Sequence, residues 1–90
     1  MKIAKVEFSH RFVKSLKKSP RKVKIALRNR LELFLTDKYH PILNNHSLAG
    51  KYKNYRSLNI SGDWRAIFRE FDDGEVIYFD FIGTNSQLYK

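Results

Sequence analysis

The sequence predicts an α+β protein in which a small, antiparallel-rich sheet of 4–5 strands carries a two-helix hairpin on one face. Helical periodicity is confined to residues 9–36, whereas short apolar stretches separated by turn residues follow from residue 55 onwards. Helices grouped before a run of strands are typical of α+β folds rather than of a parallel α/β sheet. With 90 residues, of which 42% are apolar, the chain is expected to form one domain over residues 1–90.

The first residues predict a strand followed by a short helix. Residues 3–8 mix β-branched and other apolar side chains and are expected to form the strand. Ser9 is a candidate N-cap for a helix that ends near Lys18. The apolar stripe of this helix consists of Phe12, Val13 and Leu16.

A second, longer helix is expected to follow and to run to about Thr36. Ser19 and Pro20 provide its predicted start, with proline at the first helical position. Its apolar stripe consists of Val23, Leu27, Leu31, Phe34 and Leu35. The other side is strongly charged, so we expect the helical hairpin to cover the sheet and to show lysine and arginine to solvent.

The remainder of the chain predicts a loop and then a meander. Residues 37–50 hold a proline, two asparagines, two histidines and a closing glycine, which is typical of a loop. Strands are expected at 55–60, 64–71 and 76–82, joined by tight turns at 61–63 and 72–74. The last strand is the most apolar and is expected to be the most central. Gly83 is expected to end it, which leaves a tail at 84–90 that has room for one more short strand.

The charge of the chain is high and unevenly distributed. The whole chain carries +9, and residues 1–30 hold eleven basic residues against the single acid Glu7. Such a basic block attracts polyanions, and nucleic acid is the first candidate. The alternative is a solvated helical face that serves only solubility.

Composition also excludes several classes of protein. Without cysteine, the chain has no disulfides, thiolate metal sites or cysteine nucleophiles. Its longest apolar stretch falls far short of the ~18 residues that a membrane span needs, and residues 1–10 lack the apolar region of a signal peptide. We therefore expect a cytoplasmic protein that makes no contact with membranes.

Four segments in a fixed order resemble the RelE/ParE superfamily of toxins from type II toxin–antitoxin systems, and most closely the YafQ branch of messenger-RNA interferases. They are FVKSLKKSP, HSLAGKYKNYRSLNI, GDWRAIFRE and IGTNSQLYK, which together span most of the chain. The resemblance implies a RelE-like fold and a ribosome-dependent endoribonuclease. It also implies that the ribose 2′-OH attacks the adjacent phosphate with no metal or other cofactor.

The resemblance and the charge together predict the partners. They are a cognate acidic antitoxin, in a toxin–antitoxin hetero-oligomer, and the ribosome with its mRNA. In the interferase reading, the basic helical hairpin would hold ribosomal RNA and the sheet would hold the message.

Metal-free RNA cleavage needs a base, an acid and cations that stabilise the charged phosphorane. His46 and Asp63 match positions that are functional in the YafQ branch, and Asp63 is expected to act as the base or to orient a histidine. The alternatives are a hydrogen bond that packs the loop and an ordinary turn aspartate. Trp64, the only tryptophan, is expected either to stack on a splayed base or to pack in the core. His10 and His40 are interpreted as surface residues.

Basic side chains supply the predicted RNA contacts. Arg65 and Arg69 alternate with intervening residues on one strand, so they share a face and form a plausible phosphate clamp. The predicted RNA-binding set also contains Lys51, Lys53, Arg56, Lys17, Lys18, Arg21 and Lys22, in addition to Trp64 and Arg69. The alternative for all of them is a solvated face.

Two positions depart from the branch. Gly83-Thr84-Asn85 stands where the branch commonly has Gly-Thr-His, and Asn59 replaces another histidine of the branch. Asparagine can hydrogen-bond a phosphate but cannot exchange a proton near neutral pH. Loss of one proton-transfer group lowers the rate of cleavage roughly 10²–10⁴-fold. The chain is therefore a weak or inactive nuclease, or Tyr89 or a lysine serves as the acid, or Asn85 is a substitution that attenuates toxicity.

We expect Arg65, His46, Asp63, Asn85 and Tyr89 to converge on the sheet face that points away from the helical hairpin. A second hypothesis is a non-enzymatic binding protein of the same fold, either a ParE-like gyrase inhibitor or an RNA-binding module.

Overall fold

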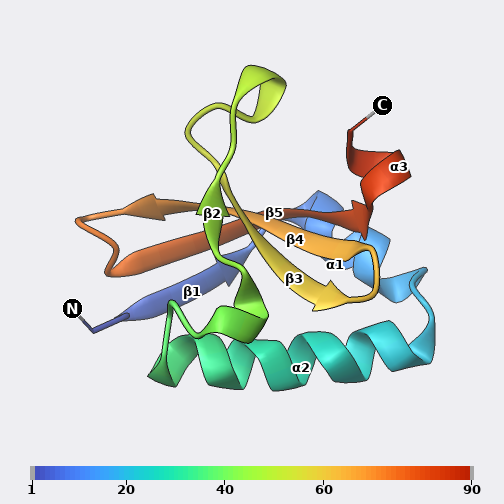
Figure 1. The fold of residues 1–90 in the computed structure, drawn as a ribbon, viewed down its shortest axis with the longest axis horizontal. Coiled ribbons are helices and arrows are strands. Elements are labelled where there is room, and N and C mark those ends of the chain that lie inside the picture. Colours follow the sequence, from blue (N-terminus) through green and yellow to red (C-terminus); the bar gives the residue numbers. More distant parts are fainter. Residues whose placement is uncertain (1, 90) are drawn as a thin grey trace.

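The computed structural model describes residues 2–89 as one five-stranded sheet with a long helix across one face (Figure 1). The α+β prediction is confirmed. The strands are β1 (Lys5–Phe8), β2 (His46–Ser47), β3 (Arg56–Ser61), β4 (Trp64–Phe71) and β5 (Val76–Thr84). The helices are α1 (His10–Lys17), α2 (Arg21–Thr36) and α3 (Asn85–Leu88).

The strands lie side by side in the order β1-β5-β4-β3-β2. Every neighbouring pair is antiparallel except β1 and β5, which run parallel from Lys5 opposite Val76 to Phe8 opposite Phe79. β4 is the middle strand, so the expectation that the strand from residue 76 is the most central is wrong. High apolarity marks β5 because helices and loops cover both of its faces, and not because of its rank in the sheet.

The helix starts follow from local hydrogen bonds. The predicted N-cap is confirmed, because the Ser9 hydroxyl accepts a bond from the backbone N–H of Phe12 at 3.0 Å. At α2 the prediction is wrong by one residue, since Pro20 is itself the N-cap and makes no side-chain capping bond. The Ser19 hydroxyl instead donates to the carbonyl of Ser15, and so closes the end of α1.

The main core lies between α2, α1 and the sheet. Phe12 from α1 and Phe34 from α2 meet Phe68 and Phe79 in a cluster of aromatic rings whose centroids are 5.2–6.0 Å apart. Val23 and Leu27 of the predicted stripe are also buried, whereas Leu35 is 52% exposed and does not join the core. Leu35 lies one residue beyond Phe34, on the solvent side of the last helical turn.

The loop and the tail contain structure that the sequence prediction missed. Residues 46–47 form the edge strand β2, which pairs with β3 inside the predicted loop. β5 continues through Gly83 to Thr84 instead of ending at the glycine. The tail then forms α3 rather than a strand, because Thr84 and Gln87 make a reciprocal capping box.

Two features of the meander set the geometry of its ends. Gly62 has φ 53°, a conformation that favours glycine, and it opens the two-residue turn between β3 and β4. A bulge in β5 lets Ile67 face Phe81 while the next residue, Phe68, faces Phe79. The bulge inserts Asp80 as an extra residue and directs its side chain to the same sheet face as that of Phe81.

Candidate functional site

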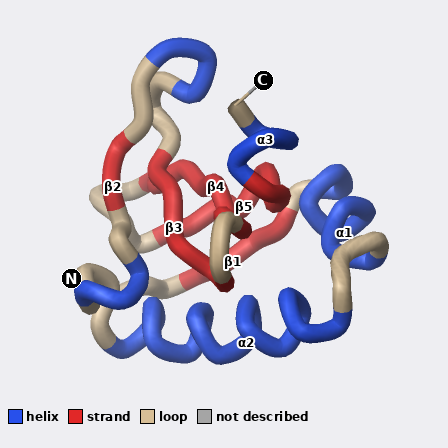
Figure 2. Tube along the Cα trace, turned by 45° about the vertical axis from the view of Figure 1, so that its right-hand side comes forward, coloured by secondary structure: helices blue, strands red, loops and turns tan. Residues whose placement is uncertain are grey.

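The candidate site lies on the sheet face opposite α2, which we call the open face. Strand alternation turns Ser57 and Asn59 of β3, Arg65 and Arg69 of β4, and Phe81 of β5 towards this face. A small second cluster around Tyr52, Ile67 and Leu88 covers part of it. Figure 2 shows the turn at 50–52 and α3 on this side of the sheet, and α2 on the other.

Asp63 and Asn85 lie side by side at the end of the open face, and we call this place the hairpin corner. The backbone N–H of Asn85 donates to the carbonyl of Asp63 at 3.0 Å. This contact arises because β4 begins where β5 ends, with Trp64 paired to Thr84. Both side chains are exposed, so they are accessible to a ligand.

Arg65 lies next to the hairpin corner and stabilises the turn between β3 and β4. One guanidinium nitrogen donates to the carbonyls of Gly62 at 2.8 Å and Trp64 at 2.9 Å. Asn59 faces Arg65 across the strand pair, and its side-chain oxygen is buried without a hydrogen-bond partner among residues 2–89. A buried acceptor without a partner is costly, which makes this part of the open face receptive to a donor.

His46 shares the open face but lies outside the corner. It pairs with Ser57, which is two residues along β3 from Asn59, or roughly 7 Å at the strand rise. Its Nδ1 is 2.8 Å from the carbonyl of Asn44. Because a carbonyl only accepts, Nδ1 is the donor in this hydrogen bond.

Tyr89 follows α3 and is 44% exposed. Its backbone N–H donates to the carbonyl of Asn85 at 2.9 Å, and its ring meets that of Tyr52 edge-on at 5.6 Å. The short helix therefore holds Tyr89 one turn away from the hairpin corner.

The predicted RNA-binding cations fall into separate groups. Arg69 is packed among the rings of Tyr55, Phe71 and Tyr78 at 5.0–6.0 Å. It lies four residues from Arg65, roughly 13 Å along the strand, so the two do not form a clamp on a single phosphate.

Arg56 points to the α2 side of the sheet, where it donates to the side-chain oxygen of Asn45 at 2.8 Å. The remaining cations are exposed. Lys51 and Lys53 lie at the turn at 50–52, beside the open face, and Lys17, Lys18, Arg21 and Lys22 lie where α1 meets α2.

Sequence reasoning missed a buried ionic cluster on the open face. Asp80 is 2% exposed, and the guanidinium of Arg11 in α1 donates two hydrogen bonds of 2.9 Å to its carboxylate. The hydroxyl of Tyr55 donates to the same carboxylate at 2.8 Å, and the Arg11 guanidinium lies 4.1 Å from the centre of the Phe81 ring. The one available signal was an aspartate within the most apolar strand, because buried carboxylates need partners.

These contacts shift the pKa values of the cluster. The Arg11 hydrogen bonds hold the pKa of Asp80 below its ordinary value and raise that of Arg11. Burial, followed by the bond to Asp80, raises the pKa of Tyr55, and burial also raises the pKa of Tyr52. Arg11, Asp80 and Tyr55 therefore tie α1 to the sheet as a charged unit near neutral pH.

The family model that describes the bacterial toxin of type II toxin–antitoxin systems, YafQ, matches residues 3–90. The chain belongs to the YafQ family. Several solved structures with this fold are similar to it. YafQ from E. coli strain BL21(DE3) is 22% identical, with a TM-score of 0.79 over 94% of this chain and 97% of that one.

Complexes are also among the similar structures. The E. coli DinJ–YafQ toxin–antitoxin complex gives 22% identity, a TM-score of 0.76 and coverage of 94% of this chain and 96% of that one. The archaeal RelE–RelB complex from Pyrococcus horikoshii OT3 gives 16% identity, a TM-score of 0.74 and coverage of 97% of this chain and 99% of that one. At these identities the likeness shows the shared YafQ and RelE fold.

Among curated proteins none matches the chain. No helix within residues 2–89 is long and apolar enough to cross a membrane.

Proposed function

We propose that this YafQ-family toxin is a ribosome-dependent endoribonuclease that cuts mRNA at the hairpin corner. The observation that supports the proposal best is the backbone hydrogen bond between Asn85 and Asp63, two residues with exposed polar side chains, next to Arg65. These residues come from two separate stretches of the chain, the turn that leads into β4 with the first residues of that strand, and the start of α3. Such convergence at a strand end, within a strongly basic chain, suits an RNA phosphate.

The proposed chemistry is an internal transfer at phosphorus. The ribose 2′-oxygen attacks the neighbouring phosphate, and the bond from phosphorus to the 5′-oxygen breaks. Asp63 takes the 2′-OH proton, or His46 takes it at Nε2. Tyr89 or a lysine returns a proton to the leaving oxygen. The products are a 2′,3′-cyclic phosphate and a 5′-hydroxyl, and Arg65 donates hydrogen bonds to the phosphorane.

The proposed partners are the ribosome with its mRNA and an acidic antitoxin, in the cytoplasm. Two observations support the antitoxin: the net charge of +9 and the two complexes above, which hold antitoxins. An acidic segment that folds over the basic surface would neutralise it.

Position 85 provides the test. We expect Asn85→His to raise ribosome-dependent cleavage about 10²-fold or more, because it supplies a proton-transfer group beside Asp63. Asn85→Ala should change little. The measurement is primer extension on a reporter message with purified ribosomes, with the parent and the two variants in parallel. The acidic antitoxin, encoded next to the toxin, is then added and should inhibit cleavage.

Two outcomes would contradict this proposal in different ways. If Asn85→Ala loses activity while Asn85→His gains none, asparagine has its own role and the proposed exchange is wrong. If all three proteins are inactive and His46→Ala binds ribosomes as well as the parent, the second candidate replaces the enzyme. That candidate is a binding protein, either an RNA-binding module or a ParE-like gyrase inhibitor, and it is favoured by asparagine at both 59 and 85.

A further inference from the structure

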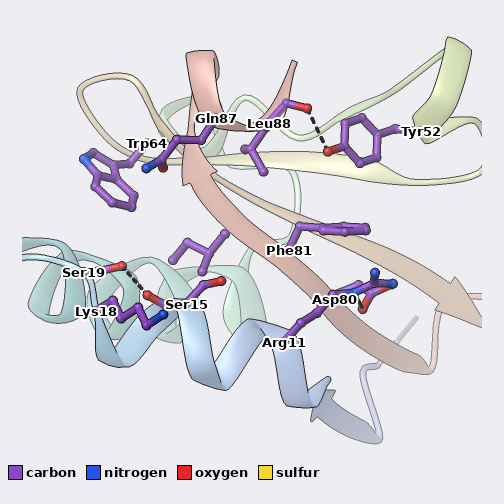
Figure 3. Close-up of a pocket in the computed structure, with 11 residues that line it drawn as sticks. Arg11, Ser15, Lys18, Ser19, Tyr52, Trp64, Asp80, Phe81, Gln87 and Leu88 are labelled. Carbon is purple, nitrogen blue, oxygen red and sulfur yellow. Dashed lines mark hydrogen bonds and ion pairs between the residues drawn. The ribbon is translucent and has the colours of Figure 1, made fainter. Parts of the chain in front are cut away.

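A cavity of about 470 Å³ lies between α1, the end of β5 and α3 (Figure 3). It exists because β1 pairs with β5 only as far as Phe79, so no strand among residues 2–89 lies beside residues 80–84 of β5 on that edge. α1 and α3 flank the uncovered stretch. The volume falls in the range of ~300–1,000 Å³ that is typical of small-molecule sites.

One part of the cavity wall is apolar and aromatic. Trp64, Ile82 and Leu88 contribute to it, and Trp64 is only partly buried because it packs against the main core on one side. An exposed tryptophan face is a stacking platform for a nucleobase, since every base has a π-face.

Across the opening from Trp64 and Gln87 lie Ser15 of α1 and the two residues that follow this helix, Lys18 and Ser19 (Figure 3). Lys18 makes no ion pair within residues 2–89, whereas the other cation of the wall, Arg11, is engaged with Asp80. Lys18 therefore supplies the positive charge that is available to an anion in this cavity.

Gln87 adds a group that can read a base edge. Its side-chain oxygen accepts the backbone N–H of Thr84 at 2.8 Å in the capping box. Its amide nitrogen makes no hydrogen bond within residues 2–89, so two donors remain for acceptor atoms on a base.

The cavity adjoins the hairpin corner through the chain itself. Trp64 follows Asp63 directly, and Gln87 lies two residues after Asn85. We propose that the cavity binds one nucleotide of the RNA next to the scissile phosphate, with its base on Trp64 and its phosphate at Lys18. This inference rests on the proposed function, and it assigns to that site a nucleotide pocket with Gln87 as a contact to the base.

The tryptophan also provides the assay. Trp64 is the only tryptophan of the chain, so its fluorescence reports stacking in the cavity without any label. The probes are guanosine and uridine 5′-monophosphate, compared with ribose 5-phosphate and inorganic phosphate. We expect the nucleotides to quench Trp64 saturably, and the two compounds without a base to leave the emission unchanged.

Three variants test the location. Ser15→Phe fills the cavity from an exposed helix position and keeps every charge, so it should abolish quenching. Lys18→Gln should weaken nucleotide binding about tenfold, the size expected for one hydrogen bond to a charged group. Lys24→Gln removes the same charge from an exposed site on α2 and should leave binding unchanged.

The inference is overturned if the nucleotides do not quench Trp64, if ribose 5-phosphate quenches equally, or if neither Ser15→Phe nor Lys18→Gln alters quenching. The cleavage assay separates this failure from that of the proposed function. Cleavage that survives Ser15→Phe refutes the pocket alone. Quenching that responds to both variants, in a protein that cleaves nothing, retains the pocket and refutes the enzyme.

Discussion

The two faces of the sheet are built from the same strands but differ in almost every property. The α2 side buries Phe68 and Phe79 completely against helical side chains. The open face carries Arg65, Arg69 and the Asp80 carboxylate, and it leaves polar atoms of Ser57 and Asn59 buried without hydrogen-bond partners within residues 2–89. Neighbouring residues on one strand therefore contribute to opposite kinds of surface.

This difference separates the surface that stabilises the fold from the surface whose polar groups are available to a ligand. Apolar burial on the α2 side supplies most of the favourable free energy, since each fully buried large side chain contributes ~1.5–3 kcal/mol. The open face contains groups that lower stability unless they are paired, and such groups are the ones that an RNA strand can satisfy. The following predictions test this division, beginning with the largest effect.

Phe79→Ala should cost about 3–5 kcal/mol of unfolding free energy, because it opens a cavity among buried rings. Phe79 is fully buried and its ring contacts those of Phe12, Phe34 and Phe68. Phe81→Ala is the matched control on the same strand, and it should cost clearly less because Phe81 is only partly buried on the open face. Urea denaturation measures both, and equal losses would contradict the division between the faces.

Asp80→Asn should cost about 2 kcal/mol at pH 7, since it removes a charged acceptor from Arg11 and Tyr55, and the exposure of Arg11 limits the loss. The folded pKa of Asp80 is lowered, so its contribution is present above the unfolded pKa and is lost as pH falls through the folded pKa.

The difference between Asp80→Asn and the parent should therefore be constant near neutral pH and shrink in acid, below about pH 4. Denaturation across pH 2–8 with both proteins tests this expectation. Asp72→Asn, at an exposed turn position whose positive φ asparagine tolerates, is the control and should show little difference at any pH. A difference at Asp80 that persists unchanged to about pH 2 would mean that the ionic bonds do not carry the effect.

The smallest expected effect is at Ser57. Ser57→Ala removes a buried hydroxyl without a partner in the described chain, so stability should stay the same or rise by up to about 1 kcal/mol. Ser9→Ala is the matched change at a buried serine that caps α1 and also donates to the Asp80 carbonyl, and it should cost about 1 kcal/mol or more. Thermal unfolding of the pair distinguishes the two serines, and a loss at Ser57 equal to that at Ser9 would refute the prediction.

Much of the fold could be predicted because local patterns agree with the final packing. Ser9 has both the residue type and the position of an N-cap, and residues 64–71 alternate as the structure requires. The errors arose where long-range contacts decide the outcome. β2 has only two residues and forms because β3 lies beside it, and α3 depends on a reciprocal bond between Thr84 and Gln87.

The site could be predicted in part for the same reason. The segments GDWRAIFRE and IGTNSQLYK predict Asp63 and Asn85 as site residues. Their proximity depends on strand register, which these segments do not show. The Arg11–Asp80 cluster joins residues 69 positions apart and depends on the bulge in β5. The aspartate within the most apolar strand is the one local signal of this cluster, and it does not show that Arg11 is the partner.

The parallel pairing of β1 with β5 has a consequence for the order of assembly. It joins Lys5–Phe8 to Val76–Phe79, so almost the whole chain separates its two halves. During synthesis β1 and α1 are made well before β5, the strand that both contact in the described chain. The antiparallel meander has only short loops to close, and loop closure sets much of the speed of folding. β1 and the basic helix α1 thus lack this docking surface until β5 has been made.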